Sequence, residues 1–181
     1  MKCLLPLLLL LFSVNLIAQC SITKEIGKHS TTYIAKMETV SLNEDLENGI
    51  NKYELRVVLN KDTDYKKPLY YMLQCRYMNS GQYRLKGECV PRSLVFQSVN
   101  GQSMIIQALK EEDVPTNGQG VQCRLYTYEI SPELEYFLKT SSLKSITFWD
   151  KRANQGIPTA PYKDLLKEQF ECIWAYGNSK L

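Results

Sequence analysis

Cysteine and histidine are the side chains best suited to covalent or metal chemistry, and this 181-residue chain has six of the first and one of the second. The cysteines are Cys3, Cys20, Cys75, Cys89, Cys123 and Cys172. None forms a C-x-x-C pair, and His29 lies far in sequence from every cysteine except Cys20. A zinc site needs several such ligands close together, so the sequence predicts no metal and no cofactor.

His29 is also the only imidazole that a Ser–His–Asp or Cys–His mechanism could use. It lies in a polar segment beside Ser30 and Thr31, and the chain contains no G-x-S-x-G nucleophile elbow. We therefore predict no catalytic residue of this type, and expect His29 to be an incidental surface residue.

Paired carboxylates can hydrolyse a glycosidic bond without histidine. Glu88, Glu129 and Asp150 lie in or at the ends of expected strands, where a rigid pair could be mounted. Because sequence does not give their separation in space, a hydrolase stays an alternative. The simpler expectation is that they lie on the solvated faces of strands.

Two acidic stretches invite a cation-binding interpretation. Residues 60–64 alternate oxygen-bearing side chains as a calcium loop does, but Tyr65 replaces the required glycine and Tyr71 the bidentate glutamate. We expect a solvated hairpin loop there. Residues 111–120 are acidic and glycine-rich, and we expect a solvated connection, with recognition of a cation or basic partner as the alternative.

Tyrosine is abundant, with twelve in the chain. Tyrosine offers a broad contact area with a polar tip, so exposed clusters favour binding surfaces. The alternative is that these tyrosines only reflect the preference of aromatic residues for strands. The candidates for a surface that binds a protein, peptide or glycan are Tyr70, Tyr71, Tyr77, Tyr83, Tyr126 and Tyr128.

The compartment is predicted by the first residues of the chain. Lys2 precedes an apolar run from Leu4 to Phe12, and small and polar residues follow around Ala18. This pattern predicts a secretory signal peptide over 1–19 and a single β-rich domain over 20–181, exported to the periplasm or the extracellular space. The run is too short and too broken for a transmembrane span.

The point of cleavage leaves two outcomes open. Cleavage after Ala18 gives a soluble protein, which we favour. Alternatively, residues 17–20 act as a lipobox, and an acylated Cys20 anchors the protein to a membrane surface. The junction resembles those of bacterial envelope proteins, but Gln19 occupies a position that normally holds Gly, Ala or Ser.

Whether the number of cysteines is odd or even bears on whether Cys20 carries a lipid. Without Cys3 five cysteines remain, so a lipid on Cys20 would leave an even number for disulfides. Without it, one thiol stays free or pairs with another chain. Four cysteines allow three connectivities, of which Cys75–Cys89 with Cys123–Cys172 is the first to test. The alternative is that all four are buried thiols.

The charges exclude one class of partner. The chain has 22 Lys and Arg against 19 Asp and Glu, a net charge of +3, with both signs interspersed. A nucleic-acid-binding protein shows a concentrated basic face. We therefore expect no nucleic-acid partner.

The elements that position these residues follow from periodicity. Alternation predicts strands over 32–40, 53–60, 69–78, 83–90, 94–99, 102–109, 121–130 and 144–150. Asn100-Gly101 predicts a type I′ turn that places Phe96 opposite Ile105. Ser131 and Pro132 predict the start of a short helix, and a longer amphipathic helix is expected over 162–176. Residues 19–31 and 41–51 are expected to be irregular.

These elements predict an α+β fold, with a mainly antiparallel sheet or two-layer sandwich of seven to eight strands. A short helix and a longer C-terminal helix pack on it. A lipocalin-like barrel is the alternative. The function we expect is a non-enzymatic binding or accessory module of the envelope or extracellular space. A carrier of a small apolar ligand and a carboxylate hydrolase are the alternatives.

Overall fold

The computed structural model describes residues 21–45, 49–62, 69–80, 93–116, 120–150, 153–158 and 163–178. The predicted signal peptide 1–19 and the predicted strand 83–90 lie outside these ranges, as do Cys20, Tyr83, Glu88 and Cys89. The predicted α+β class, with mainly antiparallel sheets, a short helix and a longer C-terminal helix, is confirmed.

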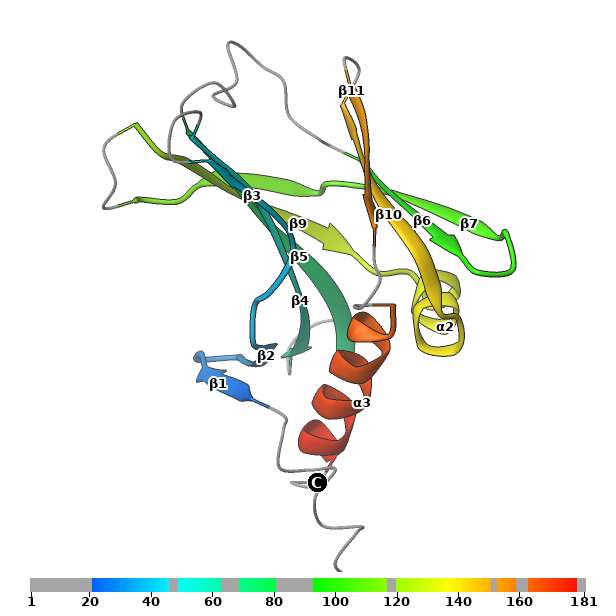
Figure 1. Ribbon diagram of the computed structural model, residues 1–181. Helices are drawn as coiled ribbons and strands as arrows, with labels where there is room; N and C mark the ends of the chain where they lie inside the picture. Colours follow the sequence, from blue (N-terminus) through cyan, green and yellow to red (C-terminus); the bar gives the residue numbers. More distant parts are fainter. Residues whose placement is uncertain are drawn as a thin grey trace, which may run out of the picture.

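The larger sheet has the strand order β1-β2-β4-β5-β9-β8, with β3 paired to β4 beside β2. The smaller sheet has the order β11-β10-β6-β7 (Figure 1). The larger sheet is open between β1 and β8, so the barrel alternative is wrong. The strands are β1 Ile22–Ile26, β2 Ser30–Ala35, β3 Glu38–Asp45, β4 Gly49–Asp62, β5 Leu69–Asn79, β6 Ser93–Ser98, β7 Ser103–Gln107, β8 Lys110–Asp113, β9 Gln122–Glu129, β10 Leu143–Asp150 and β11 Ala153–Pro158.

Two helices, α2 Pro132–Thr140 and α3 Leu165–Asn178, complete the described fold. At the start of α2 the Ser131 hydroxyl accepts a hydrogen bond from the Leu134 amide at 3.3 Å, with Pro132 in the first turn. This confirms the predicted helix start, because a serine N-cap satisfies an amide that has no partner within the helix. No helix in the described part of the chain is long and apolar enough to cross a membrane.

The alternation predicted for β4 is confirmed. Tyr53, Leu55, Val57 and Leu59 are all buried, and they lie beside buried residues of β5 on the same face of the sheet. This face packs against both helices and the smaller sheet, so that a single apolar cluster joins all the layers.

The predicted strand 32–40 is broken in the structure. β2 pairs with the second half of β4 and β3 with the first half, and the break falls opposite Val57. Here Gln169 of α3 replaces the missing strand partner. Its side-chain oxygen accepts from the Val57 amide at 2.8 Å, and its side-chain nitrogen donates to the Lys36 carbonyl at 3.1 Å.

The hairpin predicted at Asn100-Gly101 forms, but the predicted type I′ turn is wrong. Ser98 and Gln102 close a three-residue loop, and Gly101 has a φ of +89°. A type I′ turn requires positive φ at two residues, whereas a three-residue loop needs it only at the last. The register therefore shifts by one residue, and Phe96 lies opposite Met104 instead of Ile105.

Four segments that the pattern did not predict as strands form strands. Most of the segment 41–51, expected to be irregular, belongs to β3 and the start of β4, which pair with each other. β1 lies within the segment 19–31, also expected to be irregular, β11 follows β10 as a hairpin, and β8 overlaps the start of the acidic stretch 111–120. In β8, Glu111 and Asp113 lie 2.8 and 3.3 Å from Arg124 of the neighbouring strand. These cross-strand ion pairs explain how a strongly acidic segment pairs at the edge of a sheet.

Candidate functional site

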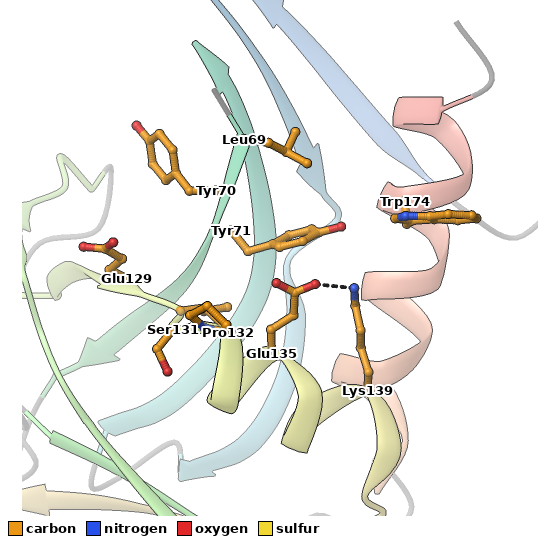
Figure 2. A pocket seen from close by; sticks show the side chains of 10 residues that line it. Leu69, Tyr70, Tyr71, Glu129, Ser131, Pro132, Glu135, Lys139 and Trp174 are labelled. Atoms are coloured by element: carbon orange, nitrogen blue, oxygen red, sulfur yellow. Dashed lines mark hydrogen bonds and ion pairs between the residues drawn. The ribbon is translucent and has the colours of Figure 1, made fainter. Parts of the chain in front are cut away.

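A cleft of about 650 Å³ opens where the start of β5, the end of β9 and the two helices meet (Figure 2). This volume lies within the range typical of small-molecule sites, roughly 300–1,000 Å³. The residues that line it are Leu69, Tyr70, Tyr71, Glu129, Ile130, Ser131, Pro132, Glu135, Lys139 and Trp174.

Backbone contacts fix the floor of the cleft. The Ile130 amide donates to the Tyr71 carbonyl at 3.1 Å, which continues the pairing of β9 with β5 up to the start of α2. The Ser131 cap then turns the chain into the helix. As a result, Glu135 and Lys139 of α2 lie beside Tyr71 of β5, whereas Tyr70 projects from the other side of the strand (Figure 2).

Tyr71 is the central residue of the site. It is only 5% exposed, its ring packs edge-on against Phe170 with centroids 5.0 Å apart, and its hydroxyl has no hydrogen-bond partner among the described residues. Burial, together with the charge of Glu135, raises the pKa of Tyr71 to about 12. The hydroxyl therefore stays protonated and able both to donate and to accept. A buried polar group without a partner is costly, so this hydroxyl keeps unused hydrogen-bonding capacity beside the cleft.

Lys139 already fills the cationic position beside this ring. Its ammonium lies 4.9 Å from the ring centroid of Tyr71 and 5.4 Å from that of Phe170. It also forms an ion pair with Glu135, one helical turn earlier. The favourable site for a cation over the Tyr71 ring is thus taken by the protein itself.

The rim of the cleft is apolar and open to solvent. Trp174 of α3 is 57% exposed and Leu69 is 49% exposed. Tyr70 also lines the cleft, and its hydroxyl accepts a hydrogen bond from the side-chain amide of Asn60. A large exposed indole beside a cleft is a common feature of binding sites, because it offers apolar area with a polar N–H.

Of the six tyrosines predicted to form a binding surface, the structure brings only Tyr70 and Tyr71 to the cleft. Tyr77, Tyr126 and Tyr128 are buried in the core, and Tyr83 lies outside the described residues. These three lie on the same face of the sheet as Tyr71, with side chains directed into the layer beneath the helices. They therefore form no exposed aromatic surface.

Sequence reasoning missed Trp174, Glu135 and Lys139. A signal for Trp174 was present, since this tryptophan interrupts the polar side of an otherwise amphipathic helix. The pair on α2 has the i, i+4 spacing of a surface ion pair, which carries no functional signal by itself.

Of the three carboxylates considered for hydrolysis, the structure brings Glu129 to the cleft. Glu129 lines the cleft together with Glu135, so two carboxylates do share this site. Asp150 is the last residue of β10, in the smaller sheet. Glu88 lies outside the described residues.

The cysteine pairing expected first is wrong. Cys75 and Cys123 are free, buried thiols, so neither the Cys75–Cys89 nor the Cys123–Cys172 bond is present. Complete burial raises the pKa of the Cys75 thiol well above its ordinary value, which makes it unreactive. Cys172 is disulfide-bonded, and its partner lies outside the described residues.

Neither of the cation-binding interpretations gains support. His29 is exposed in the turn between β1 and β2. Asn60, the first residue of the calcium-like pattern, uses its side chain to bond Thr32 and Tyr70 within the sheet. In the described ranges, no three His, Cys, Asp or Glu side chains lie close enough to hold a metal ion.

A second polar cluster lies on the opposite face of the larger sheet. Glu54 is 4% exposed, lies 2.7 Å from the Lys52 ammonium and forms a charged hydrogen bond with Arg76. Burial by itself would raise the pKa of Glu54, but the bonds to Arg76 and Lys52 outweigh it and hold the pKa below its ordinary value. The Glu54 carboxylate is paired with both cations, so we interpret this cluster as structural.

No protein family, no curated protein and no solved structure matches this chain in comparisons with each of the three. The cleft between β5, α2 and α3 therefore stands on its own geometry as the candidate site.

Proposed function

We propose that this protein is an exported, non-enzymatic binding module, and that its cleft binds a neutral, hydroxyl-rich ligand such as a unit of a glycan. The observation that carries the proposal is the buried Tyr71 hydroxyl, without a partner among the described residues, at the floor of a cleft whose rim is the exposed Trp174. An apolar platform beside an unused hydrogen-bonding group suits a ligand with one flat apolar face and several hydroxyls.

The charged side chains of the cleft favour a neutral ligand over a basic one. Glu129 and Glu135 offer acceptors for ligand hydroxyls, while Lys139 occupies the cation position over the rings. A basic peptide side chain would meet the ammonium of Lys139 at close range, and like charges repel. A neutral ligand avoids this repulsion and still uses both carboxylates.

The alternative of an apolar ligand carrier is less well supported. Such a role needs a closed, wide and mainly apolar interior, whereas the larger sheet is open and the cleft contains three ionisable side chains besides its tyrosines. Burying an apolar ligand against those groups would strip them of water without giving them hydrogen bonds.

The test is a titration with soluble neutral oligosaccharides of different backbones, followed by tryptophan fluorescence. The chain has two tryptophans, so a Trp149→Phe background assigns the signal to Trp174. We expect Trp174→Ala to weaken binding at least tenfold, which corresponds to about 1.4 kcal/mol. Binding by this variant is followed by calorimetry. Tyr71→Phe keeps the ring and removes only the hydroxyl, and we expect a loss of roughly fivefold, about 1 kcal/mol.

Tyr136→Ala is the matched control. Tyr136 is an exposed aromatic residue of α2, 71% accessible, that does not line the cleft. This variant should bind like the parent protein. Equal losses for Trp174→Ala and Tyr136→Ala, or tighter binding of lysine-rich peptides than of any oligosaccharide, would contradict the proposal.

One observation favours a second candidate, a glycoside hydrolase, because Glu129 and Glu135 line the same cleft. Incubation of the bound oligosaccharide with the protein, followed by product analysis, separates the two. Slow release of shorter sugars that Glu129→Gln abolishes, with binding retained, would establish the enzyme. An unchanged oligosaccharide supports the binding module.

A further inference from the structure

Cys172 lies in α3 and is disulfide-bonded to a cysteine outside the described residues. Cys75 and Cys123 are free, which leaves Cys3, Cys20 and Cys89 as partners. Cys3 lies in the predicted signal peptide and leaves with it. The choice is therefore between Cys20 and Cys89.

A chain of hydrogen bonds brings the start of the domain to α3. The Ser21 carbonyl accepts from the Lys36 amide at 3.1 Å, and the Lys36 carbonyl accepts from the Gln169 side chain at 3.1 Å. Gln169 lies three residues before Cys172, so the two share one side of the helix. α3 also contacts β1 directly. Since Cys20 is the residue directly before Ser21, it is close enough along the chain to reach α3.

Cys89 is kept too far from α3 to reach Cys172 by the described strand that follows it. It is four residues before Ser93, and four residues span at most about 14 Å. Ser93 pairs with Trp149, at the far end of β10 from Leu143, whose amide donates to Lys163 at the start of α3. That length of β10 is about 20 Å, and α3 then runs away from it toward β1 and β2 (Figure 1).

The other end of the same connection also starts far from α3, but the ten residues from Asn79 to Cys89 are long enough to span that distance. β5 ends at Asn79, roughly 27 Å along the strand from Tyr71, the residue that contacts Phe170 of α3. A disulfide requires its two Cα atoms to lie within roughly 4.4–6.8 Å of each other. The four residues that separate Cys89 from Ser93 are too short to bring its Cα atom this close to Cys172, so the Ser93 end excludes Cys89 as the partner.

We infer that Cys172 is bonded to Cys20. Two thiols each lose a proton and together lose two electrons, which pass to a disulfide of an exported thiol oxidase or a small disulfide, and that oxidant is reduced to its dithiol. A sulfur atom in this bond cannot carry a thioether to diacylglycerol. The mature protein is thus not lipid-anchored through Cys20, and cleavage falls before this residue. This inference does not depend on what the cleft binds.

The experiment is a tryptic map of the protein exported by a secreting host, digested without reductant after free thiols are blocked. We expect a linked pair made of the N-terminal peptide ending at Lys24 and the peptide 168–180, which separates on reduction. The tryptic peptide 87–92, which contains Cys89, should carry the blocking group. A link between 87–92 and 168–180 would overturn the inference, as would a diacylglycerol adduct on Cys20.

Two variants sharpen the test. In Cys172→Ser the thiol of Cys20 should become available to the blocking reagent, whereas Cys89→Ser should leave the linked pair intact. If Cys172→Ser is not exported, the map of the wild-type protein still decides between the two partners. A linked pair that persists in Cys20→Ser would contradict the inference.

Discussion

Glu54 illustrates how much one residue can contribute on the solvent side of a sheet. Its carboxylate is 4% exposed, yet it lies between Lys52 and Arg76, which are themselves partly exposed. The hydrogen bonds to these cations lower its pKa despite burial. A group whose pKa is lower in the folded state stabilises the fold above its ordinary pKa and loses this effect as the pH falls.

We predict that Glu54→Gln lowers the free energy of unfolding by about 2 kcal/mol at pH 7, because a charged, buried hydrogen bond is lost. The difference in the free energy of unfolding between Glu54→Gln and wild type should stay constant down to about pH 4.5, the ordinary pKa of the carboxyl group. It should then shrink as the pH falls through the lowered pKa that Glu54 has in the folded state. Urea unfolding at pH 7 and pH 3 measures it.

Glu112→Gln is the control for this prediction. Glu112 pairs with Lys110 at the surface, where both side chains are about half exposed or more. Such pairs contribute roughly 0–1 kcal/mol, so this variant should match wild type at both pH values. A gap for Glu54→Gln that is the same at pH 3 and pH 7 would show that the charge is not its origin.

Individual residues also show where sequence reasoning stops. Alternation correctly assigned the buried face of β4, because one apolar face and one polar face specify their own orientation. It could not assign Tyr77 or Tyr126, since tyrosine suits both a core and a surface. Whether such a tyrosine is buried depends on the strand it pairs with, and the pairing of Tyr126 with Cys75 is known only from the register of the sheet.

At the scale of elements, α3 does more than cover the core. It bonds the strand edge where β2 and β3 break, through the two hydrogen bonds of Gln169, and it presents Trp174 to the cleft. Its amphipathic pattern was predicted from sequence. The break was not, since a continuous β-favouring stretch gives no sign of which backbone amide will lose its partner.

We predict that Gln169→Leu lowers the free energy of unfolding by about 3 kcal/mol. The leucine fits the buried position but leaves the Val57 amide and the Lys36 carbonyl without partners, at roughly 1–3 kcal/mol each. Glu171→Gln, on the exposed side of the same helix, should change stability by less than about 0.5 kcal/mol. Chemical denaturation of the three proteins compares them. Equal stability of wild type and Gln169→Leu would show that water replaces the side chain.

Short elements were the least predictable. β11 and β8 gain their stability from the longer strands beside them, β10 and β9, and carry little alternation of their own. The hairpin between β6 and β7 was located correctly by Asn100-Gly101, but its register was not. The same dipeptide fits two loop lengths, and tertiary packing selects one of them.

Over the whole molecule, the class of fold could be predicted because many alternating segments and two amphipathic helices allow few arrangements. The site could not, because its residues come from β5, from the adjoining β9 and α2, and from α3, three segments that are far apart in the chain. One apolar cluster joins the two sheets and both helices, and its members include Leu73, Phe96, Leu138 and Phe170.

This shared core predicts a single cooperative unfolding transition for the domain. Far-ultraviolet circular dichroism follows the sheets, and near-ultraviolet signals follow the buried tyrosines. The two should report the same midpoint temperature in the oxidised protein. Separate midpoints would indicate that the smaller sheet, β11-β10-β6-β7, unfolds independently of the larger one.

The charged composition of β8 has a consequence for behaviour at high concentration. β8 is the last strand of the larger sheet, and its four residues, Lys110, Glu111, Glu112 and Asp113, are all exposed. An outermost strand offers unpaired backbone groups on which a second molecule could add, and dense charge opposes that stacking. This border of the sheet therefore resists intermolecular aggregation, which helps such a protein stay dispersed.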